Sequence, residues 1–232
     1  MQFIKKKTNE KITRTDIKAK KKMKVKVCGL KYQSNIEELI QLPIDYMGLI
    51  FYEKSPRFVN INLGFDFIRT IPKHIKKVGV FVNENSYSIC DKVAHYDLDI
   101  VQLHGDESSG LCAELKSHAK VMKVFQVNEG FDFKQLEKYI SDVDYFLFDT
   151  PTVNYGGSGK AFNWKLLKNY SYNIPFFLSG GISEEHIEKI KKLKIPQLIG
   201  IDINSKFEIE PGLKNKNKIK EFIDKLNNYD NK

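Results

Sequence analysis

Short apolar runs, rich in β-branched and aromatic residues, recur along the chain and alternate with more polar stretches. There are eight such runs, and their C-terminal ends lie 21 to 31 residues apart. They occupy residues 24–28, 46–51, 77–82, 98–103, 121–126, 145–148, 174–178 and 197–202. Short apolar runs bounded by turn-forming residues are typical of buried strands. The pattern therefore predicts eight strands that are covered on both faces.

Segments with helical periodicity fill most of the intervals between these strands. They lie at 34–42, 86–96, 106–118, 183–193 and 214–226. Ser34 or Asn35 is predicted to cap the first helix, and Ser183 the fourth, because short polar side chains accept hydrogen bonds from free backbone N–H groups.

Strands that alternate with helices form parallel βαβ units, which leaves two α/β architectures. One is an open doubly wound sheet, and the other is a closed (β/α)8 TIM barrel. The eight strands and the length of 232 residues favour the barrel as a single domain. No GxGxxG motif follows the first strand, which disfavours a dinucleotide-binding sheet.

Positive charge is concentrated at the N-terminus. Residues 1–22 contain nine Lys or Arg and two acidic residues, so they supply +7 of the net charge of +9. We interpret residues 1–22 as a basic, disordered N-terminal extension and residues 23–232 as the barrel domain. Such an arm could contact nucleic acid or an anionic membrane. The rest of the chain is nearly neutral, and we expect neither partner.

Composition narrows the class of protein further. A 232-residue chain that is 41% hydrophobic can bury a large core. No apolar run approaches the roughly 18 residues of a membrane span, and the N-terminus has no signal-peptide pattern. Three widely spaced cysteines form no CxxC pair, which is typical of the reducing cytoplasm. No Cys/His cluster has metal-ligand spacing, so no metal is expected.

Candidate phosphate-binding residues follow the last two predicted strands. The active site of a (β/α)8 barrel lies at the C-terminal ends of its strands, and the last two loops often bind phosphate through backbone N–H groups. Gly180 and Gly181 follow the seventh strand, and Ser205 follows the eighth. The alternative is that the two glycines only form a tight turn. A second glycine-rich stretch, 155–159, is predicted to be a loop that closes over substrate.

Three other strand ends carry reactive side chains. Cys28 ends the first strand and is either a small buried hydrophobe or a thiolate base. Lys26, two residues earlier, is predicted to point the same way as Cys28. Asp149 ends the sixth strand, where a carboxyl group is costly unless it is paired or used. Arg57 offers a planar fork for a carboxylate, or else it forms a surface salt bridge.

Six sequence motifs occur together in a characteristic order. They are KVCGL, FYEKSPRFV, VQLHGDE, FDT…NYGGSGKAFNW, LSGGI and GIDINSKFE…PGLKN. In this order and spacing the chain resembles phosphoribosylanthranilate isomerase, a (β/α)8 enzyme of tryptophan biosynthesis. The resemblance runs from about Lys24 to the C-terminal helix.

The resemblance implies an Amadori rearrangement of a small phosphorylated substrate, with no cofactor and no metal. The family's general base falls on Cys28, its general acid on Asp149 and its carboxylate-binding arginine on Arg57. The remaining implied substrate-binding residues, for the phosphate and the sugar hydroxyls, are Gly180, Gly181, Ser205 and Asp202. Monomer and homodimer are both left open.

The chain departs from the family pattern after the eighth strand, and rival functions are possible. Asn204 replaces a serine and Lys206 a glycine, so Lys206 could add a cation near the phosphate. A related aminoaldose isomerase of histidine biosynthesis is one alternative, but such enzymes use an aspartate where this chain has Cys28. A non-catalytic phosphate-ligand binder, or a nucleic-acid-associated protein that uses the basic arm, is the other.

Overall fold

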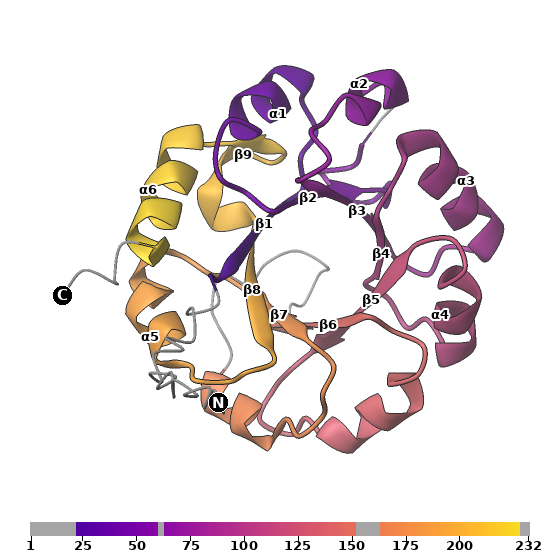
Figure 1. The fold of residues 1–232 in the computed structure, drawn as a ribbon, viewed down its shortest axis with the longest axis vertical. Helices are drawn as coiled ribbons and strands as arrows, with labels where there is room; N and C mark the ends of the chain where they lie inside the picture. Colours follow the sequence, from indigo (N-terminus) through magenta and orange to yellow (C-terminus); the bar gives the residue numbers. More distant parts are fainter. Residues whose placement is uncertain (1–21, 60–62, 152–162, 228–232) are drawn as a thin grey trace, which may run out of the picture.

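A computed structural model describes residues 22–59, 63–151 and 163–227 of the chain. Eight parallel strands pair in chain order, and the last strand pairs with the first, so the sheet closes on itself (Figure 1). This confirms the predicted (β/α)8 barrel. The glycine-rich loop at 155–159 lies outside the described residues, as does nearly all of the predicted extension at 1–22.

Each of the eight apolar runs forms one barrel strand. The strands are β1 (Lys24–Cys28), β2 (Tyr46–Ile50), β3 (Lys76–Phe81), β4 (Ile100–Leu103), β5 (Lys120–Gln126), β6 (Tyr145–Asp149), β7 (Phe176–Leu178) and β8 (Leu198–Ile203). A short hairpin follows β8 and consists of β9 (Glu208–Glu210) and β10 (Leu213–Lys214). The C-terminal ends of the strands differ from the predicted ends by no more than one residue.

Helices surround the barrel (Figure 1). The α-helices are α1 (Gln33–Leu39), α2 (Phe65–Arg69), α3 (Ser86–Tyr96), α4 (Ser109–Leu115), α5 (Ile187–Lys192) and α6 (Lys216–Asn227). Tighter 3₁₀ turns form η1 (Phe133–Tyr139), η2 (Trp164–Asn169), η3 (Glu184–His186) and η4 (Ser205–Phe207). No described helix is long and apolar enough to cross a membrane.

The predicted cap of the first helix is wrong. Helix α1 begins at Gln33 with Tyr32 in the cap position, so Ser34 and Asn35 lie inside the first turn. Asn35 is buried, and its side chain exchanges two hydrogen bonds with the backbone of Lys214. Asn35 therefore ties the first helix to the end of the β9–β10 hairpin. Ser183 does cap the segment that leads into α5, and its hydroxyl contacts the ring of His186.

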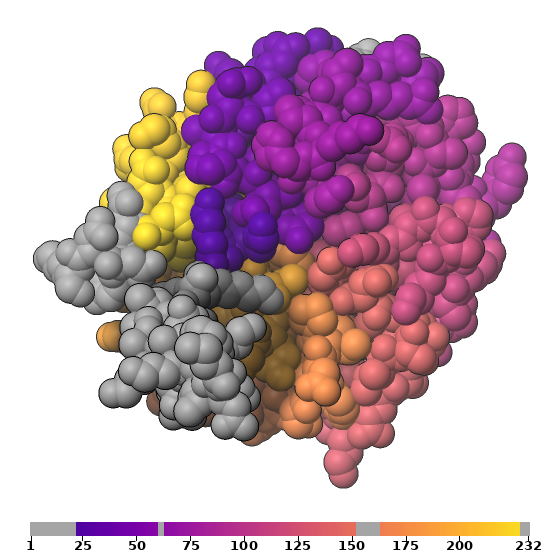
Figure 2. Space-filling view, in the orientation of Figure 1, coloured from indigo at the N-terminus to yellow at the C-terminus, as the bar shows by residue number. Residues whose placement is uncertain are grey.

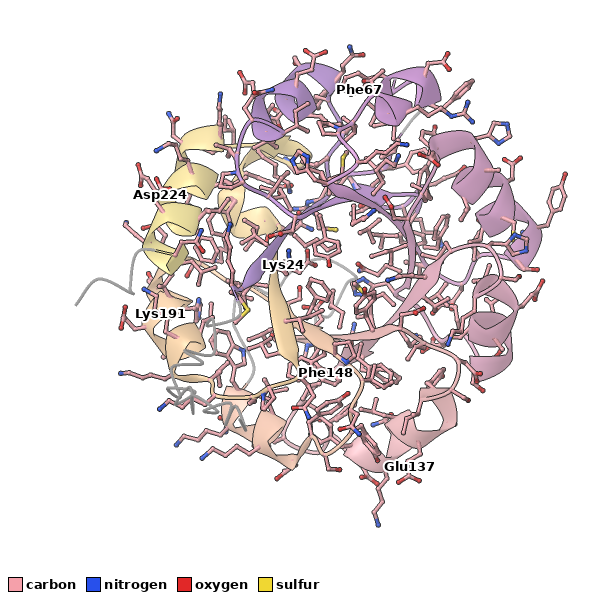
Figure 3. The ribbon with its side chains drawn as sticks, viewed as in Figure 1. Lys24, Phe67, Glu137, Phe148, Lys191 and Asp224 are labelled. Atoms are coloured by element: carbon pink, nitrogen blue, oxygen red, sulfur yellow. The ribbon has the colours of Figure 1, made fainter. Side chains whose placement is uncertain are left out.

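Two apolar layers hold the strands in place. Alternate residues of each strand point inward, and Tyr46, Leu147 and Phe177 belong to a cluster in the barrel interior. The residues between them point outward into a larger cluster under the helices. Phe148 is one of these, whereas Glu137 lies on the outer ring of side chains (Figure 3). Because both faces are covered, the strands are apolar along almost their whole length.

The two ends of the described barrel meet. Strand β8 pairs with β1, and helix α6 packs beside α1. In the space-filling view the C-terminal helix lies directly against the start of the barrel (Figure 2). Residues that are far apart in sequence, on the first and last strands, therefore share one site at the C-terminal mouth.

Candidate active site

A pocket opens at the C-terminal ends of the strands, and every one of the eight strands or the loop after it contributes a residue. The seven residues predicted to act in catalysis or substrate binding all line this pocket: Cys28, Arg57, Asp149, Gly180, Gly181, Asp202 and Ser205. The structure therefore brings into one place side chains that are up to 177 residues apart in the sequence.

Cys28 is buried at the end of β1 and faces the pocket. A Cβ atom at position 48 on the neighbouring strand would lie 2.7 Å from Cys28 Sγ, so Gly48 makes the room for the thiol. Burial raises the pKa of the Cys28 thiol above its usual value, while the charges of Lys26 and Lys214 act to lower it. The thiol is therefore mostly protonated at neutral pH, and its thiolate is a stronger base than that of an ordinary cysteine.

Lys26 lies on the same side of β1 as Cys28, as strand alternation predicts, and its side chain is fully buried. Its Nζ atom lies 3.0 Å from Asp202 Oδ1 on β8. Burial alone lowers the pKa of Lys26, but the Asp202 carboxylate and Cys28 outweigh burial and hold the pKa above its ordinary value. The Ser179 hydroxyl lies 3.4 Å from Asp202 Oδ2. A fixed positive charge thus stands beside the thiol.

Asp149 ends β6, and among the described residues its carboxylate contacts Thr150 and His104. Oδ1 accepts a hydrogen bond from the backbone N–H of Thr150 at 2.8 Å, and Oδ2 lies 3.4 Å from His104 Nε2. His104 follows β4 and also lines the pocket. A lone histidine at a strand end gave no site in the sequence, because nothing in it indicated that β4 and β6 place the two groups together.

Arg57 is paired rather than exposed. Its Nε and Nη2 atoms donate to the two carboxylate oxygens of Glu208, at 2.8 and 2.7 Å. Glu208 also accepts from Lys214 Nζ at 2.6 Å, and Asn204 Oδ1 accepts from the same ammonium. Burial raises the pKa of Glu208, but Arg57 and Lys214 outweigh it and lower the pKa below its ordinary value. This network fixes the guanidinium plane of Arg57. It also gives a reason for Asn204 after β8, because the side-chain oxygen of Asn204 accepts a hydrogen bond from Lys214.

The loops after β7 and β8 form one wall of the pocket. Gly180 and Gly181 both have positive φ angles, +92° and +63°, which glycine adopts readily. A Cβ atom on Gly180 would overlap Thr150, so the backbone there passes too close for any side chain. Ser205 begins η4, and Lys206 is an exposed cation on the same wall. The wall offers backbone N–H groups, a hydroxyl and a cation, which suits an anion.

The sequence analysis assigned no role to several polar residues of the site, among them Gln102 and His104 in the pocket and Glu208 and Lys214 beside Arg57. Gln102 and His104 lie at the end of an apolar run, where a polar side chain is unusual, and that position could have identified them. The described residues contain no group of three or more His, Cys, Asp or Glu side chains placed to hold a metal ion.

Comparison with known proteins shows which family the chain as a whole resembles. The model of the family described as N-(5'-phosphoribosyl)anthranilate (PRA) isomerase matches residues 25–225. A curated N-(5'-phosphoribosyl)anthranilate isomerase from Parabacteroides distasonis is 44% identical over 209 residues, which covers 88% of this chain and 93% of that protein.

Solved structures give the same result. Phosphoribosyl anthranilate isomerase from Thermotoga maritima is 31% identical with a TM-score of 0.75, and the match covers 88% of this chain and 98% of that one. A further isomerase structure, 27% identical with a TM-score of 0.72 and the same coverage, holds reduced 1-(o-carboxyphenylamino)-1-deoxyribulose 5-phosphate.

Proposed function

The chain belongs to the N-(5'-phosphoribosyl)anthranilate isomerase family, an isomerase of tryptophan biosynthesis, and we propose that Cys28 is its general base and Asp149 its general acid. The reaction converts the aminoaldose N-(5-phosphoribosyl)anthranilate into the aminoketose 1-(2-carboxyphenylamino)-1-deoxyribulose 5-phosphate. The substrate is a small phosphorylated molecule. Whether the chain is a monomer or a homodimer is left open, and a cytoplasmic location stays a prediction.

Asp149 protonates the ring oxygen of the ribose, and the ring opens as the amine lone pair forms a Schiff base at C1. The carboxyl group is suited to this step because the Thr150 N–H and His104 hold its orientation. A proton donor contributes most when it is fixed within hydrogen-bond reach of the atom it protonates. His104 is therefore a positioning residue for the acid.

The Cys28 thiolate then removes the proton from C2 to give an enolamine, which converts to the aminoketose. A thiolate can form in this buried place because Lys26 and Lys214 supply positive charge beside it. Burial keeps the pKa of Cys28 high, and a base with a high pKa binds the proton strongly once it is ionised. The rate should rise with pH as the thiolate fraction grows.

Two anchors hold the substrate between the base and the acid. Gly180, Gly181 and Ser205 bind the phosphate through backbone N–H groups and a hydroxyl, with Lys206 as an added cation. Arg57 binds the anthranilate carboxylate. The pairing with Glu208 engages two of the five N–H donors of the guanidinium and leaves the plane rigid. Fixing both ends of a substrate makes the reacting step effectively unimolecular.

Asp202 completes the pocket on the side of the sugar. Its carboxylate is held by Lys26 and Ser179 and lines the pocket next to the phosphate wall. Burial raises the pKa of Asp202 and Lys26 opposes that effect. We assign Asp202 to the sugar hydroxyls, which a carboxylate oxygen accepts well.

The observation that most supports this function is that all seven residues line one pocket, with a cysteine and an aspartate from different strands and an anion-binding wall. The test is the loss of fluorescence when purified protein is mixed with freshly generated phosphoribosylanthranilate. Cys28→Ala and Asp149→Asn should each lower kcat by about 10²- to 10⁴-fold.

Cys90→Ala is the matched control, because Cys90 lies on α3 away from the pocket, and it should retain wild-type turnover. Absence of turnover in the wild type would overturn the function. Full turnover in both Cys28→Ala and Asp149→Asn would overturn the residue assignment and leave the function standing.

A further inference from the structure

Gln102 is a buried polar side chain that the mechanism above does not use. It lies on β4, is 1% exposed, and lines the same pocket as Cys28 and Asp149. Its register neighbours, Val80 on β3 and Met122 on β5, are both apolar. An amide in such a place loses its hydration and needs polar partners in return.

The neighbouring histidine determines how this amide is oriented. Gln102 Nε2 lies 3.4 Å from His104 Nδ1, and His104 Nε2 lies 3.4 Å from Asp149 Oδ2. A neutral imidazole that directs its N–H toward the carboxylate presents Nδ1 as an acceptor. The Gln102 amide nitrogen then donates to Nδ1. This assignment turns the other end of the amide, Oε1, away from the histidine.

Gln102 Oε1 is buried and has no hydrogen-bond partner among the residues that the structure describes. Buried polar atoms in native proteins almost always have a partner, so an exception that lines a pocket requires an explanation, and a bound ligand is one. Reversing the amide does not fit the histidine. Oε1 would then accept from His104 Nδ1, and a neutral imidazole would turn an unprotonated Nε2 toward the Asp149 carboxylate.

We propose that Gln102 is a substrate-binding residue whose Oε1 accepts a hydrogen bond from a hydroxyl or N–H donor of the sugar–amine segment between Cys28 and Asp149. The proposal rests on the proposed function, which supplies a substrate with ribose hydroxyls and an anilino N–H in that segment. A ligand without a donor there would leave the amide buried and unpaired in the complex. Gln102 therefore contributes to specificity as well as to orientation.

The test is Gln102→Met, which keeps the length of the side chain and removes both polar atoms. We expect kcat/KM for phosphoribosylanthranilate to fall at least about 10-fold. The Kd of the reduced product analogue, measured by calorimetry, should rise by a similar factor. The Tm of the free protein should change little, because Gln102→Met removes a buried oxygen that has no partner together with one long hydrogen bond to His104.

Met122→Leu is the matched control, since Met122 is the register neighbour on β5 and carries no hydrogen-bonding group. It should keep wild-type kcat/KM and analogue binding. Wild-type kcat/KM in Gln102→Met would overturn the proposal, and so would a loss of activity that follows a lowered Tm. If the wild type shows no turnover, the proposed function fails. In that case binding of the reduced product analogue tests the role of Gln102 separately. An equal Kd in the wild type and in Gln102→Met would overturn the proposal for Gln102.

Discussion

Two buried lysine–carboxylate pairs in this barrel have the same length and different surroundings. Lys26 and Asp202 join β1 to β8, and Lys123 on β5 pairs with Glu107 in the loop after β4. In both pairs the nitrogen–oxygen distance is 3.0 Å, and no side chain of the four is more than 6% exposed. Distance and burial alone therefore do not distinguish them.

Their other contacts do distinguish them. Lys123 Nζ also contacts backbone carbonyls, the nearest being that of Gly105 at 2.7 Å, and Glu107 accepts from the backbone N–H groups of Asn83 and Gly105. The Lys26–Asp202 pair has the Ser179 hydroxyl and the Cys28 thiol as further contacts, and the Asp149 carboxylate also acts on it electrostatically. Lys123 and Glu107 form further hydrogen bonds to the backbone of two loops, so we expect a structural role for that pair. Lys26 and Asp202 form fewer hydrogen bonds, so we expect their charges to act on the groups in the pocket.

Breaking the satisfied pair should have the largest effect, and the effect should be on stability. Lys123→Met leaves the Glu107 charge buried without its cation, which costs about 3–5 kcal/mol in free energy of unfolding. Urea unfolding measures this change. Lys220→Met is the control, because the Lys220–Asp224 pair is exposed and should contribute about 0.5 kcal/mol or less. A kcat/KM per folded molecule that falls more than about threefold would contradict a purely structural role.

Breaking the other pair should change the chemistry as well as the stability, because Lys26→Met also leaves a buried carboxylate, Asp202, without its cation. Lys26→Met removes a cation that lowers the pKa of Cys28, so that pKa rises further and less thiolate exists at neutral pH. We expect kcat/KM at pH 7.5 to fall about 10- to 100-fold, and its rising limb to move to higher pH, since each pKa unit changes the thiolate fraction about tenfold.

The pH dependence of inactivation by iodoacetamide reports the Cys28 thiolate separately from turnover. Lys24→Met is a matched control on the same strand, because Lys24 is half exposed and pairs with Asp45. Its limb should coincide with that of the wild type. If the rising limb of the pH profile stays at the same pH in Lys26→Met while kcat/KM is still reduced, Lys26 acts through packing alone.

A smaller effect should come from an exposed cation of the same site. Lys206→Ala removes a charge from the phosphate wall, and we expect KM to rise about 3- to 10-fold with little change in kcat, as for binding that is equal in ground and transition states. The difference should shrink at high salt. Lys192→Ala, on an exposed part of α5 outside the pocket, should leave KM unchanged. An unchanged KM in Lys206→Ala would remove Lys206 from the site.

The smallest effect should come from the predicted N-terminal extension. We expect deletion of residues 1–22 to change kcat/KM by less than about twofold, because the match to the family begins only at residue 25. Steady-state kinetics of the truncated and full chains measure this. A large decrease would make the extension part of the enzyme, and nucleic-acid binding that survives the deletion would place a second activity in residues 23–232.

The fold could be predicted because its determinants are local. Each strand in the structure coincides with an apolar run of the sequence, and its C-terminal end lies close to the end of that run. The predicted site residues lie together for the same reason, since the C-terminal ends of barrel strands meet at one mouth. Cys28 and Asp149 needed only their positions at strand ends to be placed in the same pocket.

Contacts between distant segments could not be predicted in the same way. Arg57 and Glu208 are 151 residues apart, and nothing near either one indicates the other. Local propensity predicts Ser34 or Asn35 as the cap of the first helix, but the buried hydrogen bonds between Asn35 and Lys214 outweigh that propensity. Which distant residues meet depends on the register of the strands around the closed barrel. That register is a property of the tertiary structure and cannot be deduced from local sequence.

The link between Lys26 and Asp202 has a consequence for synthesis of the protein. The two residues are 176 positions apart, so the ribosome has made most of the chain before the partner of Lys26 exists. Until β8 emerges, β1 is an edge strand that carries a lysine destined for the interior, and a barrel without its last strand would bury that charge alone. The same event that closes the barrel also completes the surroundings of Cys28, the proposed base, so no nascent fragment that ends before Asp202 should be catalytically competent.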